Sequence, residues 1–148
     1  MLGQPPKPLK VDLSELRIAL KTESSELKWY VDVTNGEVLL VNHEYEPNEH
    51  GGLTVEEIEA APLRYLRVPQ ATADDLLSDM WAFKAEVNDP RLAESIDLAL
   101  GGLRPERRFK ALLGWLPGLI EAWQTFRERR VEDRALSWLA SRGYEPKR

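Results

Sequence analysis

The chain has 148 residues, of which 20 are basic and 25 acidic, so its net charge is −5. With 43% hydrophobic and 30% charged residues, the composition is typical of one soluble globular domain and excludes a long disordered chain. The longest uncharged run, residues 111–120, is about half as long as a membrane-spanning helix, and the absence of cysteine excludes disulfides, thiolate metal sites and a cysteine nucleophile.

Residues 1–10 predict an extended and mobile tail, because three of them are proline. A short helix follows, with Asp12 or Ser14 near its cap. Its apolar stripe has helical spacing and consists of Leu13, Leu16 and Leu20.

Residues 27–41 carry the clearest local signal. Two strand-like runs flank Asn35-Gly36, a pair that favours a two-residue hairpin turn because both positions accept a positive φ. Such a turn would place Val33 opposite Val38. The face that packs on the core would then carry Trp29, Val31, Val33, Val38 and Leu40.

The next two elements complete a small sheet. The spacing of Thr54 and Glu57 fits a capping box and predicts a short helix that ends near Ala60. Residues 63–68 then predict a third strand, which Pro69 ends. Residues 11–69 are therefore expected to form the sheet-containing part of the chain.

Residues 70–144 are expected to be helical. Capping signals at Thr72, Asp89 and Pro105 open three helices, and two more helices follow, the last of which ends at Gly143. Arg127–Arg130 interrupts the apolar stripe of the last two helices and predicts a bend or a rotation there, although one long helix also fits. The expected fold class is α+β: residues 1–148 form a single domain in which a three-stranded antiparallel sheet packs against about five C-terminal helices.

Charge is distributed unevenly along the chain. Residues 1–99 contain 19 acidic and 9 basic residues (net −10), whereas residues 100–148 contain 6 acidic and 11 basic residues (net +5). Such asymmetry indicates either an anionic partner for the basic part or attraction between the two parts, within one fold or across a dimer.

The first basic cluster lies where a glycine-rich turn runs into the helix that Pro105 opens. It consists of Arg104, Arg107, Arg108 and Lys110. Arginine near the N-terminal end of a helix opposes the helix dipole, which indicates a partner of some kind. That partner is either an acidic group of the same protein or subunit pair, or an anionic ligand.

The second basic cluster lies on one predicted helix, between Trp123 and Trp138. It includes Arg129 and, on one helix face, Arg127, Arg130 and Arg134. Arginine interleaved with aromatic residues is typical of nucleic-acid surfaces, and equally of arginine stems packed on tryptophan in ordinary helices. Interspersed acids and a pI of about 5.2 weigh against nucleic acid.

The sequence offers little for catalysis or for cofactors. His43 and His50 share one loop with several glutamates, but their spacing matches no known metal-ligand pattern. No serine lies in a nucleophile elbow, and neither nucleotide-binding fingerprint is present. We expect no catalytic residues, no metal and no cofactor, and therefore a protein that is not an enzyme.

Four segments, taken in their order along the chain, carry a resemblance to a known family. They are residues 30–38, residues 64–69, Gly102 with Arg107-Arg108-Phe109-Lys110, and residues 123–139 with Trp123, Phe126, Arg134-Ala135 and Trp138-Leu139. Together they resemble a bacterial uncharacterised protein family over about residues 12–144. The resemblance implies an α+β arrangement and no known activity, so it supplies no catalytic residues.

We therefore expect a bacterial, cytoplasmic, non-enzymatic interaction or regulatory module that does not associate with membranes. Its working surface would be a basic strip that binds a protein or another acidic partner, and self-association into a homo-oligomer stays open. The strip consists of Arg104, Arg107, Arg108 and Lys110, extended by Arg127, Arg130 and Arg134. The alternative function is nucleic-acid binding through the same strip.

Overall fold

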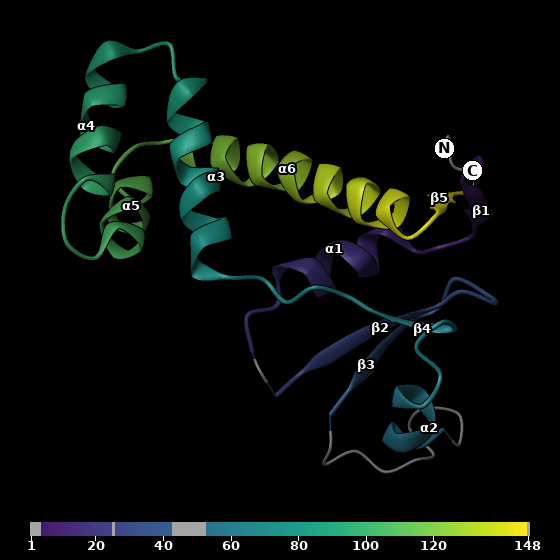
Figure 1. Cartoon of the computed structure of the whole chain (residues 1–148). Coiled ribbons are helices and arrows are strands. Elements are labelled where there is room, and N and C mark those ends of the chain that lie inside the picture. Colours follow the sequence, from purple (N-terminus) through teal and green to yellow (C-terminus); the bar gives the residue numbers. More distant parts are fainter. Residues whose placement is uncertain (1–3, 25, 43–52, 148) are drawn as a thin grey trace. The chain divides into compact units, whose positions relative to one another are not determined.

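The computed structural model describes residues 4–24, 26–42 and 53–147 (Figure 1). Within these residues the protein is α+β, as predicted, with six helices, a three-stranded antiparallel sheet and a parallel pair of short strands. The chain divides into two compact units, one comprising Met1–Gln70 with Val131–Arg148 and the other comprising Ala71–Arg130. That all 148 residues form a single domain stays a prediction.

The first unit is built on the sheet. Its strands are β2 (Lys28–Asp32), β3 (Val38–Val41) and β4 (Tyr65–Arg67), in the order β3-β2-β4 with both pairings antiparallel. Helix α1 (Leu13–Lys21) and the C-terminal part of α6 (Leu119–Ser141) cover one face, and α2 (Val55–Glu59) lies against the other (Figure 1).

Each face of this sheet has its own core. On the α1 side Val31 is fully buried beside Leu16 and Leu139, and Trp29, Val33 and Val38 pack around them. The sequence placed these sheet residues together on one face, and that grouping is confirmed. The opposite face is also buried because α2 covers it; its core consists of Tyr30, Leu39, Val41, Ile58 and Tyr65.

The predicted hairpin turn and register are wrong. Val31, not Val33, lies opposite Val38, and residues 33–37 connect the two strands. The amide N–H of Gly36 donates to the carbonyl of Asp32 (2.7 Å), and only Gly36 of the Asn-Gly pair has a positive φ (79°). Because the register differs by two residues, each side chain keeps its face of the sheet.

The amino-terminal segment is also better ordered than predicted. Within residues 1–10, Lys7–Leu9 form β1 and pair in parallel with β5 (Tyr144–Pro146). Leu9 is buried in the core on the α1 side of the sheet. That burial, together with the backbone pairing, holds the segment in place, and neither was visible in a proline-rich sequence.

The second unit is helical. It contains α3 (Ala73–Ala85), α4 (Pro90–Leu100), α5 (Pro105–Leu113) and the first part of α6. The predicted starts are confirmed: Thr72 and Asp75 form a reciprocal capping box, and Asp89 caps α4 ahead of Pro90. Aromatic rings fill the centre, with the Phe109 centroid 4.9 Å from that of Trp123 and 6.2 Å from that of Phe83.

Helix α6 runs without a break through Arg127–Arg130, so the alternative of one long helix is confirmed. Its buried face does rotate there. Trp123 and Phe126 lie in the core of the second unit, whereas Ala135 and Leu139 lie in that of the first. At 3.6 residues per turn these pairs differ in direction by about half a turn. Among the described residues, no helix combines the length and the apolar character needed to cross a membrane.

Candidate functional site

The entry into α5 has an unusual backbone. Arg104 is the N-cap and adopts left-handed helical angles (φ 52°, ψ 57°), and its side chain caps no backbone N–H. Pro105 follows as the first helical residue and disfavours the right-handed helical region for the residue before it. The Arg104 side chain is therefore exposed and free of a capping role.

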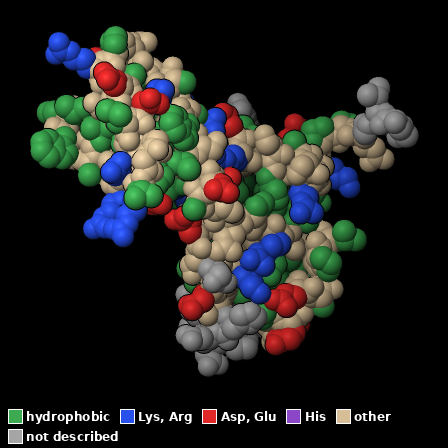
Figure 2. Space-filling model, turned by 60° about the vertical axis from the view of Figure 1, so that its left-hand side comes forward, with side chains coloured by type: hydrophobic (Ala, Val, Ile, Leu, Met, Phe, Trp, Pro, Cys, Tyr) green, Lys and Arg blue, Asp and Glu red, His purple; other side chains and the backbone are tan. Residues whose placement is uncertain are grey.

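A pocket of about 490 Å³ lies where the first turns of α3 and α5 meet. From α3 it is lined by Ala73, Asp74 and Leu77, and from the start of α5 by Arg104, Pro105, Glu106, Arg107 and Lys110. Figure 2 shows hydrophobic side chains interspersed with lysine and arginine on one face of the molecule. The pocket thus combines an apolar floor with three cations at its rim.

The charges at the rim are only partly balanced. Lys110 Nζ lies 2.8 Å from Glu106 Oε1, one turn before it on α5, so these two charges offset each other. By contrast, the side chains of Arg104 and Arg107 are exposed and form no ion pair or hydrogen bond with a residue that the structure describes. Asp74 lies in the first turn of α3, where the helix dipole favours an acid. The arginines are therefore available to a partner.

Arg108 does not belong to this pocket. Its guanidinium packs on Gly102, so closely that a Cβ added to that glycine would collide with it. Three of the four residues of the first predicted cluster are thus brought together, and the fourth covers the turn that precedes α5.

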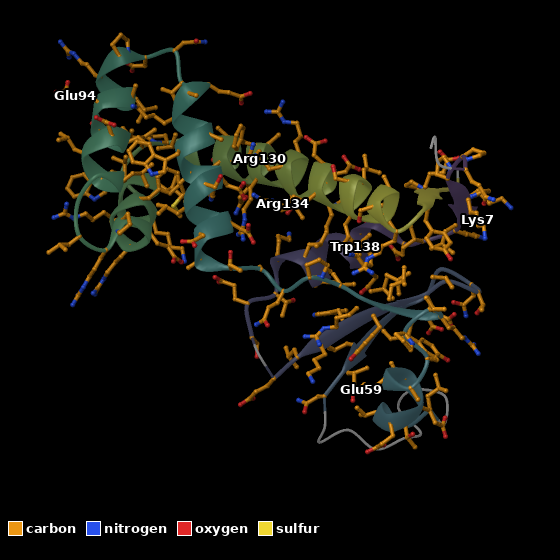
Figure 3. The ribbon with its side chains drawn as sticks, viewed as in Figure 1. Lys7, Glu59, Glu94, Arg130, Arg134 and Trp138 are labelled. Carbon is orange, nitrogen blue, oxygen red and sulfur yellow. The ribbon has the colours of Figure 1, made fainter. Side chains whose placement is uncertain are left out.

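The second predicted cluster is largely engaged within the fold. Arg130 Nε donates to Asp79 Oδ1 (2.9 Å), and Asp79 is only 1% exposed. Arg127 is partly buried, and its Nε has no hydrogen-bond partner among the described residues. Arg134 belongs to the other unit and also interacts within the structure; Figure 3 labels it with Arg130 on α6. Whether any of these arginines binds a partner stays a prediction.

The contribution of α3 to the pocket was missed. Nothing in the sequence marked Asp74 or Leu77 as a pocket residue. The two helices meet because Phe83 of α3 and Phe109 of α5 share one core, which is a tertiary contact. The sequence pattern does not reveal such a contact, so the pocket could not be predicted from it.

The described residues contain no group of three or more His, Cys, Asp or Glu side chains placed to hold a metal ion. His43 and His50 lie outside those residues. The expectation about them therefore stays a prediction.

Comparison with known proteins assigns relatives but no activity. The model of an uncharacterised protein family, UPF0158, matches residues 6–147. The chain is 29% identical to UPF0158 protein PA5073 of Pseudomonas aeruginosa over 140 residues, which cover 95% of this chain and 88% of that relative. No solved structure matches the chain.

Proposed function

This chain belongs to the uncharacterised protein family UPF0158, and we propose that it is a non-catalytic interaction module that binds an acidic segment of a partner protein in the pocket between α3 and α5. The partner segment would place a hydrophobic side chain on the floor formed by Leu77 and Pro105. Aspartate or glutamate residues beside it would bind Arg104 and Arg107.

The observation that carries this proposal is the pair of unengaged arginines beside an apolar pocket. A guanidinium can bind a carboxylate through two parallel hydrogen bonds, which gives both orientation and energy. Arginine and buried hydrophobic anchors are also typical of the few interface residues that dominate binding energy. Because Lys110 is already paired with Glu106, we assign the specific contacts to Arg104 and Arg107.

The chemistry of the lining side chains supports binding rather than catalysis. The described residues of the lining carry no hydroxyl, thiol or imidazole group, and their carboxylates are those of Asp74 and Glu106. Glu106 and Lys110 neutralise each other at 2.8 Å, which leaves neither poised as a base or a nucleophile. Two arginines on an apolar floor can recognise an anion, but they do not form an acid–base pair.

A peptide selection tests the proposal. The full-length protein would be used to select binders from a random twelve-residue peptide library, and the affinities of the selected peptides would be measured by fluorescence polarisation. We expect peptides in which a large hydrophobic residue lies between acidic residues. The affinity should fall at least tenfold in Arg104→Gln and in Arg107→Gln, because each change removes a charge-assisted contact.

The matched control is Arg91→Gln, which removes an exposed arginine of the same unit that does not line the pocket. Its peptide affinity should equal that of the wild type. Selected peptides that are neutral or basic, or an affinity that both pocket variants retain, would contradict the proposal.

A further inference from the structure

A second pocket, of about 300 Å³, lies in the sheet-containing unit. Its deeper walls are Tyr30 of β2, Ile58 of α2 and Tyr65 of β4, and its rim carries Glu59, Arg67 and Arg142. These residues come from two strands, one helix and the segment after α6, so the folded unit assembles the pocket; Figure 3 labels Glu59 at α2.

The two tyrosines bring unused hydrogen-bonding groups to this pocket. Tyr30 is 5% exposed and Tyr65 is 4% exposed. Neither hydroxyl bonds to a residue that the structure describes. A buried tyrosine normally finds a partner for its hydroxyl, and here that partner would have to come from outside.

The rim has an excess of positive charge. Glu59 is paired with Lys28, with 3.7 Å between Oε1 and Nζ. Arg67 and Arg142 are exposed and form no ion pair with a described residue, and the guanidinium of Arg67 lies 5.7 Å from the centre of the Tyr30 ring. Two arginines and two tyrosines therefore line the same pocket, and their side-chain donors have no acceptor among the described residues.

We propose that this pocket binds a small organic anion whose single carboxylate or phosphate group accepts hydrogen bonds from Arg67, Arg142 and the tyrosine hydroxyls. The apolar body of the ligand packs on Pro62, an exposed residue of the lining. The pocket volume is at the lower end of the range for small-molecule sites, roughly 300–1,000 Å³, so the ligand is smaller than a nucleotide. This site is in a different unit from the α3–α5 pocket and does not depend on the function proposed for it.

Titrations of the ¹⁵N-labelled full chain with three probes test this inference by NMR. The probes are benzoate, phenyl phosphate and the uncharged benzyl alcohol. We expect saturable shifts of the resonances of Tyr30, Ile58 and Tyr65 with at least one of the two anions, and at least tenfold weaker binding of the alcohol. The stronger of the two anions identifies the head group.

Variants then assign the donors. We expect Arg67→Gln and Arg142→Gln each to weaken binding of the preferred anion about tenfold, and Tyr65→Phe to weaken it several-fold, while the spectrum away from the pocket stays unchanged. Lys147→Gln removes an exposed cation of the same unit that does not line the pocket, and it should leave the affinity unchanged.

The inference is overturned if neither anion gives saturable shifts at these residues. It is also overturned if benzyl alcohol binds as tightly as the anions, or if the Arg67→Gln/Arg142→Gln double variant binds like the wild type. Because Arg104→Gln and Arg107→Gln leave this pocket intact, failure here and failure of peptide binding are separate results.

Discussion

In the proposed function, Arg104 favours binding at the expense of stability. Among the described residues it alone has a side chain on a backbone with positive φ, at 52°. The left-handed conformation costs such a residue roughly 1–2 kcal/mol, which glycine would avoid. A strained residue that keeps its side chain exposed at the rim of a pocket is consistent with selection for what the side chain binds.

We therefore predict that Arg104→Gly stabilises the protein and weakens peptide binding together. After allowance for the extra freedom of glycine in the unfolded chain, the gain in unfolding free energy should be about 0.5–1 kcal/mol in urea denaturation. Arg104→Gln is the control, because it removes the charge and keeps the strained backbone; its stability should match the wild type. A destabilised Arg104→Gly variant would contradict this account.

Gly36 is required for a different reason. It has a φ of 79°, and a Cβ added there would collide with the carbonyl group of Lys10. Because that neighbour is backbone, it cannot turn aside. We predict that Gly36→Ala lowers the unfolding free energy by about 2–5 kcal/mol, which combines the backbone strain with overpacking.

The control for Gly36 is Gly143→Ala. That glycine has a φ of 87° and nothing within 4 Å of an added Cβ, so its substitution introduces the backbone strain alone. It should cost about 1 kcal/mol. Equal losses for the two variants would show that the approach of Lys10 to the hairpin is absent in solution.

Asp32 connects the hairpin to Arg64, the residue that precedes β4. Its buried carboxylate accepts hydrogen bonds from the backbone and hydroxyl of Thr34 and from Nε and Nη2 of Arg64, at 2.6 to 3.3 Å. Burial acts to raise the pKa of Asp32, but the bonds from Arg64 and Thr34 outweigh it, and the net result is a pKa below the ordinary 3.8. The folded state therefore favours the ionised carboxylate.

The stabilisation from Asp32 is complete above the carboxyl pKa of the unfolded chain and is lost as the pH falls through the lower folded-state value. We predict that Asp32→Asn costs about 1–3 kcal/mol at pH 7. The difference between wild type and variant should shrink as the pH falls below about 4. Denaturation curves from pH 3 to pH 7 check this, and a difference that stays constant would show that the charge contributes nothing.

At the scale of elements, the sequence predicted the features that depend on residues close together in the chain. The starts of α3, α4 and α5 follow from capping residues and prolines close to each helix, and all three are confirmed. The hairpin register was wrong because Asp32 is bonded to Arg64, 32 residues away, and the loop up to Gly36 closes on its carbonyl. The candidate site divides in the same way: its α5 residues were found, and its α3 residues were not.

Helix α6 supplies an element-scale prediction, because adjacent arginines differ in environment. Arg130 pairs with a buried Asp79, whereas Arg129 lies 3.6 Å from Glu86 with both side chains more than half exposed. We predict that Arg130→Ala costs about 3 kcal/mol, because the buried carboxylate loses this partner. Arg129→Ala should cost less than about 1 kcal/mol. Thermal or urea unfolding of the two variants measures both losses. Equal losses of unfolding free energy would refute the structural role of Arg130.

At the scale of the whole molecule, the charge asymmetry of the sequence largely disappears. Residues 71–130 contain 10 acidic and 9 basic residues (net −1), and the other unit contains 15 acidic and 11 basic residues (net −4). The contrast between −10 and +5 along the chain is lost mainly because the acidic residues 71–99 (7 acidic, 2 basic) and the basic residues 100–130 (3 acidic, 7 basic) belong to the same unit. Neither unit is therefore net basic, whereas a dedicated nucleic-acid-binding domain usually is.

This charge balance leads to the prediction that separates the two functions expected from the sequence. If the basic strip bound nucleic acid through four to seven contacts, the affinity for duplex DNA would fall with salt with a log–log slope of roughly −4 to −6. We predict instead no binding to duplex or single strands tighter than the non-specific range, about 10⁻⁴–10⁻⁶ M near 150 mM salt, because Arg130 is paired with Asp79 and both units repel a polyanion. Fluorescence anisotropy with labelled DNA and RNA measures this directly.

Submicromolar binding that Arg107→Ala and Arg108→Ala abolish, in a protein that remains folded, would make nucleic acid the better assignment and would leave the α3–α5 pocket without an acidic peptide partner.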